Sequence, residues 1–316
     1  MAPGSTLRLP QACLFAGRKK GIGVRENKEE GCFLDRKSSI ENRQLKLSRS
    51  NNSSNSSLDI PRLNASPFVR HVEFHAELGS TNDRALELAR ETEHETPVLV
   101  IAERQTAGRG RGANQWWSGP GALTFSLVLD PMQIGLQKKH WPRLALTAGL
   151  SVCEVLQTLM PQKSSALKWP NDVWLESKKV CGILVEIPDC PPPAVPKLVL
   201  GLGINVNNSL RNAPPEIQAF GTSLCDQGNA NFDSTDVLIS LLERLEKNLQ
   251  TLAADRDELA DRWQSLCALT GRTVEVHLGS QCIRGVCRGI DREGALTLQS
   301  DQRLERIFGG VVTAIE

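Results

Sequence analysis

From Phe68 onward, short apolar runs with the character of strands alternate with longer stretches whose apolar residues repeat at helical spacing. Pro97–Glu103 and Ala122–Leu129 are short and apolar enough to be buried strands. Trp141–Leu159 instead has apolar residues at helical intervals along one face, which predicts a helix. Alternation of this kind predicts a sheet with helices packed against it, so we assign the chain to the mixed α+β class.

The same pattern continues for most of the chain and then changes. Further strands are predicted at Ala166–Trp169, Val180–Ile187 and Leu198–Val206, and one long helix at Ser234–Cys267. After about residue 270 the apolar pieces become short and alternating, and glycines separate them. These pieces are Thr273–His277, Cys282–Ile290, Ala295–Gln299 and Val311–Ile315. They predict a small antiparallel β-barrel.

The chain therefore divides into three predicted parts. Residues 1–65 are rich in Ser, Asn, Lys and Arg and have no sustained period, which predicts a disordered N-terminal extension. Residues 66–268 form the larger folded domain, and residues 269–316 form the small C-terminal barrel domain. Residues 1–25 contain basic residues and no acidic one, which is typical of an organelle presequence but also compatible with an extension that has no targeting role.

The overall charge favours no polyanionic partner. Lys and Arg number 37 against 36 Asp and Glu, a net charge of +1, so we expect neither nucleic acid nor an anionic membrane to bind. No apolar run reaches the roughly 18 residues that suggest a membrane span, and we expect a cytoplasmic protein. The nine cysteines and five histidines form no zinc-type motif, so we expect reduced thiols and no protein-ligated metal. Mg²⁺ carried by a nucleotide stays open, because that ion needs few protein ligands.

The first segment with chemical character is Glu103–Ser118, which follows a predicted strand and is rich in Gly, Arg and Trp. Its glycines allow the backbone to wrap an anion, while Arg109 and Arg111 supply fixed charge and planar donor groups. We interpret the segment as a clamp for phosphate and carboxylate. An exposed basic loop or an RNA-binding segment is the alternative. Trp116 could stack on adenine or belong to the core.

The second segment is Leu167–Ile183, where a Pro-Asn-Asp turn separates two strand-like runs. As a structural signal it predicts only a hairpin. Polar residues that gather beside these buried runs are harder to explain by structure alone, and they are Lys168, Asn171, Asp172, Lys178 and Lys179. If Lys179 faces a pocket, it could neutralise a carboxylate and an α-phosphate together.

Two further segments are weak when taken alone. Gly201–Asn207 follows an apolar strand but lacks the third glycine of a dinucleotide-binding fingerprint. In Gly79–Asp83, Ser80 and Asp83 fit a capping box that opens a helix at Asn82–Arg90. A plain helix cap explains that segment without any ligand.

Together and in this order, the four segments resemble those of the biotin–protein ligases, which are called holocarboxylase synthetases in eukaryotes. The resemblance extends from about Val69 to Glu316, and the tail is similar to the small SH3-like C-terminal domain of the bacterial enzymes. It implies a mixed-sheet biotin/lipoate ligase-like catalytic domain followed by an SH3-like β-barrel. It also implies a ligase that converts biotin and ATP to biotinyl-5'-AMP and transfers biotin to a lysine of a biotin carboxyl carrier protein.

The resemblance assigns roles to individual residues. It implies that biotin contacts Ser80, Thr81, Asn82, Gln105, Gly108, Arg109, Gly110, Arg111, Lys179 and Gly182. It implies that ATP and the adenylate contact Arg109, Arg111, Trp116, Lys168, Asn171 and Asn205. The catalytic residues expected on this basis are Lys179, Arg111 and Asp172.

The chemistry explains why these residue types are needed. Biotin's carboxylate and the α-phosphate repel each other by roughly 4 kcal/mol at about 4 Å, so we assign Arg109, Arg111, Lys179 and Mg²⁺ to cancel that repulsion. The acceptor lysine must attack as a neutral amine, and only around one in a thousand is neutral at pH 7. Our hypothesis is that Asp172 orients this amine and accepts its proton.

Rival functions and partners stay open at this point. A lipoate–protein ligase would share the fold and the adenylate chemistry, and a non-catalytic RNA-binding protein would use the Arg/Gly segment. No helix-turn-helix pattern precedes residue 65, so we expect no DNA binding. A sheet edge beside the active site could pair with the acceptor or with a second copy in a homodimer.

Overall fold

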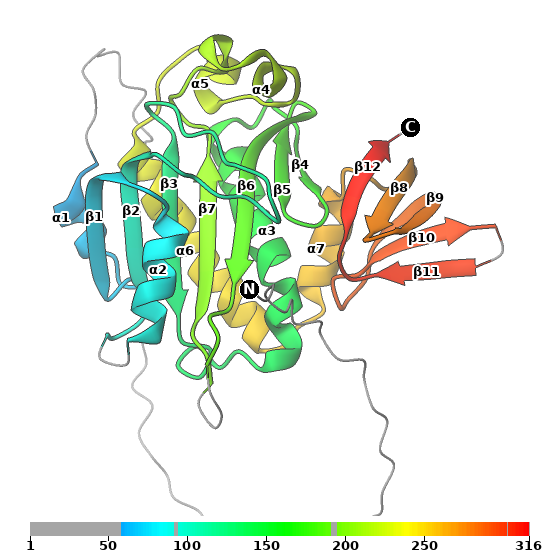
Figure 1. Ribbon diagram of the computed structural model, residues 1–316, viewed down its shortest axis with the longest axis horizontal. Helices are drawn as coiled ribbons and strands as arrows, with labels where there is room; N and C mark the ends of the chain where they lie inside the picture. Colours follow the sequence, from blue (N-terminus) through cyan, green and yellow to red (C-terminus); the bar gives the residue numbers. More distant parts are fainter. Residues whose placement is uncertain (1–57, 92–93, 191–194, 302, 316) are drawn as a thin grey trace, which may run out of the picture. The chain divides into compact units, whose positions relative to one another are not determined.

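The larger part of the fold is a seven-stranded mixed sheet (Figure 1). The computed structural model describes residues 58–91, 94–190, 195–301 and 303–315. The strands are β1 His71–Leu78, β2 Val98–Gln105, β3 Leu123–Leu129, β4 Ser165–Lys168, β5 Asp172–Leu175, β6 Lys178–Glu186 and β7 Leu198–Ile204. They lie in the order β1-β2-β3-β7-β6-β5-β4, with β1 parallel to β2 and the other neighbours antiparallel. The predicted α+β class is confirmed.

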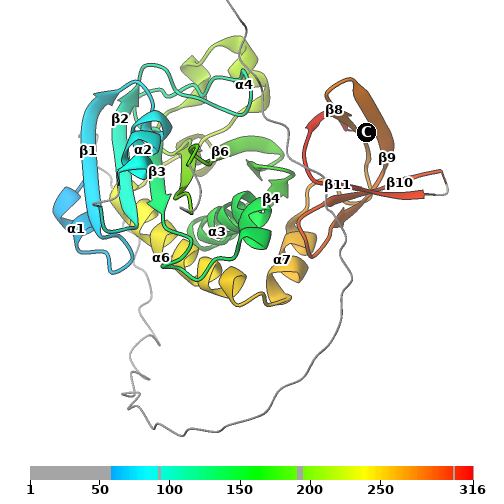
Figure 2. The same cartoon turned by 60° about the horizontal axis from the view of Figure 1, so that its bottom comes forward.

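Helices cover both faces of this sheet, which explains why β3 and β7 are buried along their whole length (Figures 1 and 2). Helix α2, Thr81–Arg90, packs on one face through Ala85 and Leu88. Helices α3, Leu144–Leu159, and α6, Ser234–Ala253, pack on the other face. Successive strand residues point to opposite faces, so each central strand supplies both interfaces.

The long helix predicted at Ser234–Cys267 is wrong, because the structure divides this segment in two. Helix α6 ends at Ala253, and α7 spans Glu258–Leu266. Between them Asp255 has φ of 53°, a left-handed conformation that an α-helix cannot continue. The Asp255 carboxylate lies 2.8 Å from the Lys139 ammonium and 2.9 Å from the Arg143 guanidinium. These ion pairs stabilise the break.

The prediction of disorder over residues 1–65 needs correction at its end. Helix α1 spans Ile60–Asn64, and its Leu63 is fully buried in the main core. The Asp59 backbone N–H donates to Thr235 Oγ1 at 3.0 Å and so joins α1 to the start of α6. Residues 1–57, including the candidate presequence at 1–25, lie outside the described residues.

The C-terminal segment forms a five-stranded antiparallel sheet, as the short alternating runs predict. Its strands are β8 Thr273–Leu278, β9 Gln281–Ile290, β10 Leu296–Ser300, β11 Arg303–Ile307 and β12 Val311–Ile315, in the order β11-β10-β9-β8-β12. No run in the sequence predicted β11. Among the described strands, β11 and β12 form the two edges and do not pair with each other. The described sheet is therefore open, whereas a closed barrel would require that pairing. The Trp169 indole N–H donates to the Gly294 carbonyl at 3.1 Å and fastens this sheet to the β4–β5 turn.

Three short helices complete the part of the chain that the structure describes between β7 and α6, and an additional one precedes α3. They are η2 Leu210–Asn212, α4 Pro215–Phe220 and α5 Leu224–Gly228, and η1 spans Lys138–Arg143. Among the described residues, none of the helices combines the length and the apolar character that crossing a bilayer requires.

Candidate active site

The sequence-predicted residues converge on one cavity of about 620 Å³. Its walls come from the start of α2, the loop after β2, the β4–β5 turn, the strands β6 and β7, the α4 region and β12. The predicted residues that line it are Ser80, Thr81, Asn82, Gln105, Arg109, Gly110, Arg111, Trp116, Lys168, Asn171, Asp172, Lys179, Gly182 and Asn205. Gly108 is the predicted residue that does not line it.

Gly108 instead packs against the backbone of Trp116 within the same loop. It is buried, its carbonyl accepts the Trp116 backbone N–H at 2.9 Å, and a Cβ built on it would lie 2.6 Å from the Trp116 carbonyl oxygen. A side chain at this position would separate the two backbones. Gly108 is therefore needed for the shape of the loop, and Trp116 depends on it for its position.

The start of α2 presents polar side chains to the cavity. Ser80 occupies the N-cap position, but its side chain makes no capping bond, so the predicted capping box is wrong. The Thr81 backbone N–H donates to Gln105 Oε1 at 2.7 Å. The Ser126 hydroxyl lies 2.8 Å from Thr81 Oγ1 and 2.5 Å from Asn82 Oδ1. The start of α2 and Gln105 thus supply uncharged hydrogen-bonding groups to this end of the cavity, next to the ion pair of Arg109 with Glu186.

Arg109 is held by carboxylates rather than standing free in the cavity. Its guanidinium makes two bonds to the Glu186 carboxylate, at 2.9 and 2.6 Å, and lies 2.8 Å from Asp83 Oδ1. Glu186 raises the pKa of the Arg109 guanidinium above its ordinary value. The same carboxylate accepts from Asn82 Nδ2 at 2.8 Å. Glu186 was not predicted from the sequence, because a single acid at the end of a strand forms no recognisable pattern.

Arg111 has a different environment. Its guanidinium donates to Asn171 Oδ1 and to the Gly310 carbonyl, each at 3.2 Å, and both acceptors are uncharged. Burial lowers the pKa of the Arg111 guanidinium from its ordinary value. Asn171 is fixed in turn, since its Nδ2 donates to the Ile183 carbonyl at 2.7 Å. A half-buried guanidinium bonded to neutral groups is well suited to receive an anion.

The lysines lie at the β4–β5–β6 end of the cavity. Lys179 Nζ is 2.6 Å from Asp172 Oδ1 and 5.8 Å from the ring centroid of Trp116. Lys168 Nζ lies over the Trp174 ring at 5.5 Å. Burial lowers the pKa of the Lys168 ammonium, and Lys179 lowers it further while Asp172 opposes the shift. An anionic ligand entering here would meet several cations in a partly buried space.

Glycines form the floor of the cavity on two paired strands. Gly182 on β6 lies opposite Gly203 on β7, and Gly201 is two residues earlier on the same face. A Cβ on Gly201 would lie 1.8 Å from Asn82 Oδ1, and one on Gly203 would lie 2.3 Å from Trp116 Cε2. Side chains are thus excluded from this floor. The available signal was glycine inside an apolar strand, which marks a close approach by another group.

The far end of the floor is also polar. Asn205 follows Gly203 by two residues, is 5% exposed, and donates from Nδ2 to the Thr222 carbonyl at 3.0 Å. At about 3.3 Å per residue, Gly201 and Asn205 are about 13 Å apart along the strand. The cavity is therefore long enough for an elongated ligand with two polar ends.

Several lining residues come from segments that sequence analysis did not connect with the site. The cavity lining includes Ile217 and Phe220 of α4 and Val311 and Val312 of β12. Phe220 and Val311 are 76% and 57% exposed. No signal in the sequence places residues this far apart beside the Arg/Gly loop, because only the tertiary fold brings them together.

Comparison with known proteins agrees with this arrangement. The sequence matches the biotin/lipoate A/B protein ligase family over residues 76–205. The bifunctional ligase/repressor BirA of Bacillus subtilis is 32% identical over 241 residues, covering 76% of this chain and 72% of that protein. The biotin–[acetyl-CoA-carboxylase] ligase of Mycobacterium tuberculosis is 33% identical over 246 residues, covering 77% and 88%. A solved biotin protein ligase from Aquifex aeolicus, in complex with biotin and ATP, has a TM-score of 0.66 at 31% identity and covers 77% of this chain and 98% of that one.

Proposed function

This chain belongs to the biotin/lipoate A/B protein ligase family, and we propose that it is a biotin–protein ligase. It activates biotin with ATP to biotinyl-5'-AMP and transfers the biotinyl group to a lysine of a biotin carboxyl carrier protein. The observation that carries the proposal is the convergence of Arg111 and Lys179 on the glycine-floored cavity, between an uncharged polar end and a second polar end.

Biotin has a neutral, polar ring system and a charged carboxylate, and the cavity divides in the same way. We assign the ring to the end formed by Ser80, Thr81, Asn82 and Gln105, whose neutral donors and acceptors match a ureido group. The carboxylate then extends along the floor toward Arg111 and Lys179. Arg109 contributes indirectly, since its bonds to Glu186 hold the loop that contains Gly108 and Gly110 in position.

The nucleotide occupies the remaining length of the cavity. We assign adenine to Trp116, whose indole borders the glycine floor, and the polar contacts of the nucleotide to Lys168, Asn171 and Asn205. Gly182 gives the reacting groups room beside Lys179, because a Cβ there would lie 3.3 Å from Lys179 Nζ. With the α-phosphate and the carboxylate both between Arg111 and Lys179, their mutual repulsion is offset where the bond forms.

The residues present are compatible with Mg²⁺ that arrives with the nucleotide. Asp172 and Glu186 each bind a cation of the protein already, so the ion would be held mainly by phosphate oxygens and water, as is common for Mg²⁺. When bound, it would supply positive charge to the phosphates. The chain's own contribution is the set of cations around the α-phosphate.

The second step needs a group that accepts the proton of the acceptor lysine. We propose Asp172, which is 17% exposed and is bonded to Lys179. Once biotinyl-AMP has formed, its negative phosphate shares Lys179 with Asp172 and frees part of the carboxylate for the incoming amine. The amine attacks the biotinyl carbonyl carbon, AMP leaves, and Asp172 takes the proton.

Partners and location complete the proposal. The acceptor carrier domain enters at the opening bordered by α4 and β12, or along the edge strand β1, whose C-terminal end leads to Ser80. A second copy pairing along β1 would give a homodimer, and light scattering of the purified protein distinguishes a dimer from a monomer. We place the reaction in the cytoplasm. We also retain 66–268 and 269–316 as the two folded domains.

A pyrophosphate-release assay tests the function directly. The protein is given ATP and Mg²⁺ with biotin or with lipoate, and a biotin carboxyl carrier domain is then added. Biotin-dependent pyrophosphate followed by one biotin on the carrier is the expected result. Lipoate dependence would make the chain a lipoate–protein ligase, and no release with either acid would refute adenylation altogether.

A further inference from the structure

The C-terminal sheet carries three potential metal ligands on one hairpin. Strands β8 and β9 are joined by a two-residue turn in which Gly279 has φ of 65°, as a type II′ turn requires at its first position. The register places Cys282 directly opposite His277. In this hairpin the pair next to the turn exchanges backbone hydrogen bonds, so the following pair brings its side chains closest. Glu275 precedes His277 by two residues and therefore shares its face.

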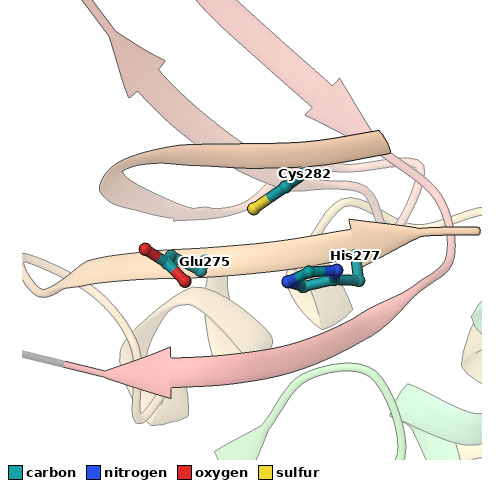
Figure 3. A group of neighbouring side chains, drawn as sticks. All are labelled: Glu275, His277 and Cys282. Carbon is teal, nitrogen blue, oxygen red and sulfur yellow. The ribbon is translucent and has the colours of Figure 1, made fainter. Parts of the chain in front are cut away.

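The side chains confirm this juxtaposition (Figure 3). One ligand atom from each of Glu275, His277 and Cys282 lies within 4.8 Å of the other two. Figure 3 shows the Cys282 thiol directed toward the strand that carries Glu275 and His277. Ligand atoms around a tetrahedral Zn²⁺ lie about 3.5 Å apart, given metal–ligand bonds of about 2.0–2.3 Å. Closing the group around one ion therefore needs shifts on the order of 1 Å from exposed or half-buried side chains.

We propose that Glu275, His277 and Cys282 form a surface site for a thiophilic divalent transition metal ion of the Zn²⁺ class. Thiolate and imidazole ligands favour Zn²⁺ and Co²⁺ over the hard ions Mg²⁺ and Ca²⁺, which prefer oxygen. Three protein ligands leave one tetrahedral position for water. The spacing of these residues in the sequence did not predict this site, because they form no recognised zinc motif and come together only through strand pairing.

The neighbouring groups set the character of the site. Arg284 lies opposite Glu275 on β9 and donates to Glu275 Oε1 at 3.3 Å, which leaves the second carboxylate oxygen for a metal. Its positive charge lowers the affinity for a cation, so we expect weaker binding than at a buried structural zinc site. On the other side of β8, Val311 pairs with His277 and supplies no ligand.

This site is separate from the nucleotide cavity. Glu275, His277 and Cys282 are not among the residues that line that cavity, whereas Val311 of the adjacent strand β12 is. A metal ion at the hairpin can thus be measured without ATP, and its binding is independent of the proposed ligase reaction.

The test uses the full-length protein, reduced and freed of metal with a chelator. Co²⁺ is titrated and the thiolate-to-cobalt charge-transfer absorption is recorded, and Zn²⁺ is titrated by calorimetry. We expect one ion per chain and loss of the absorption band in Cys282→Ser. His277→Ala and Glu275→Gln should weaken binding by about 10- to 100-fold or more, since even changes outside the ligand shell cost that much.

The matched control is Cys190→Ser, because Cys190 is a partly exposed free thiol outside the group. It should bind both ions like the unmodified protein. Circular dichroism checks that each variant is folded. We expect the fold to be retained, because the substituted side chains are exposed or half-buried. The proposal is overturned if the unmodified protein shows no saturable one-to-one binding, if Cys282→Ser binds unchanged, or if Cys190→Ser removes the absorption band.

Discussion

Replacing Gly203 by Ala should change the shape of the cavity floor and slow the reaction, while the stability of the fold changes little. The added Cβ would lie 2.3 Å from Trp116 Cε2 and 2.6 Å from Trp116 Nε1, whereas ordinary contacts begin at 3.4 Å. Trp116 must therefore move by about 1 Å or more, since β7 is buried on both faces and cannot retreat. A misplacement of about 1 Å can cost about a hundredfold in rate, or about 2.7 kcal/mol.

The assay is single-turnover formation of biotinyl-AMP, followed by thermal unfolding of the same sample. We expect adenylate formation to fall about a hundredfold while the melting temperature changes little, because the clash is with a loop residue. Gly79→Ala is the matched control, since a Cβ there meets nothing within 4 Å. In a Trp116→Ala background, Gly203→Ala should cost much less, because the clashing ring is gone. Adenylate formation within twofold of the unmodified protein would refute the argument.

Four further predictions follow from the site and the fold. Lys179→Ala should slow adenylate formation by up to about a thousandfold, because a charge at about 4 Å contributes roughly 4 kcal/mol, whereas Lys179→Arg should retain part of the rate. Asp172→Asn should slow transfer from preformed biotinyl-AMP by about 10²- to 10⁴-fold, measured with a carrier domain. Because the pKa of Lys168 is lowered, its charge is lost at a lower pH than for an ordinary lysine. The KM for ATP should therefore rise on the alkaline side, and Lys168→Arg should remove this dependence. Leu63→Ala should lower the free energy of unfolding by about 2–5 kcal/mol in chemical denaturation, because Leu63 is fully buried.

Each of these has an outcome that contradicts it. Adenylate formation unchanged in Lys179→Ala would remove that lysine from the reaction. Normal transfer in Asp172→Asn would mean that a group other than Asp172 accepts the proton. A KM that rises equally in Lys168→Arg would assign the alkaline effect elsewhere. Stability unchanged in Leu63→Ala would mean that α1 does not belong to the core.

Most strands of the larger sheet were predictable because their apolar runs are bounded by turn residues, but no bounds were predicted for β1 and β5. For the five strands with predicted bounds in this sheet, the ends agree within two residues, as at Leu198–Val206 against Leu198–Ile204. The break between α6 and α7 was not predictable, since the leucine spacing continues toward it and Asp255 gives no warning of its left-handed conformation. Helix α1 was missed because only tertiary packing of Leu63 orders such a short segment.

The residues of the cavity likewise divide into those that a local sequence motif predicts and those that depend on a distant partner. Residues in contiguous motifs, such as Arg109, Arg111 and Lys179, were found because charge and glycine cluster in sequence. Glu186 and Gly203 were missed as site residues, since each acts through a partner distant along the chain. Resemblance supplied residue roles that no pattern of spacing could supply.

The bond from Arg111 to the Gly310 carbonyl has a consequence for how the protein becomes active during synthesis. Protein chains leave the ribosome from the N-terminus, and early domains fold first. Strand β12 is made after every other described strand, yet its Val311 and Val312 complete the cavity wall. A nascent chain can therefore assemble the mixed sheet and the loops around it while the wall is still missing. Adenylation then requires that β12 has been synthesised and has joined the wall, which keeps a reactive anhydride out of chains that still lack this strand.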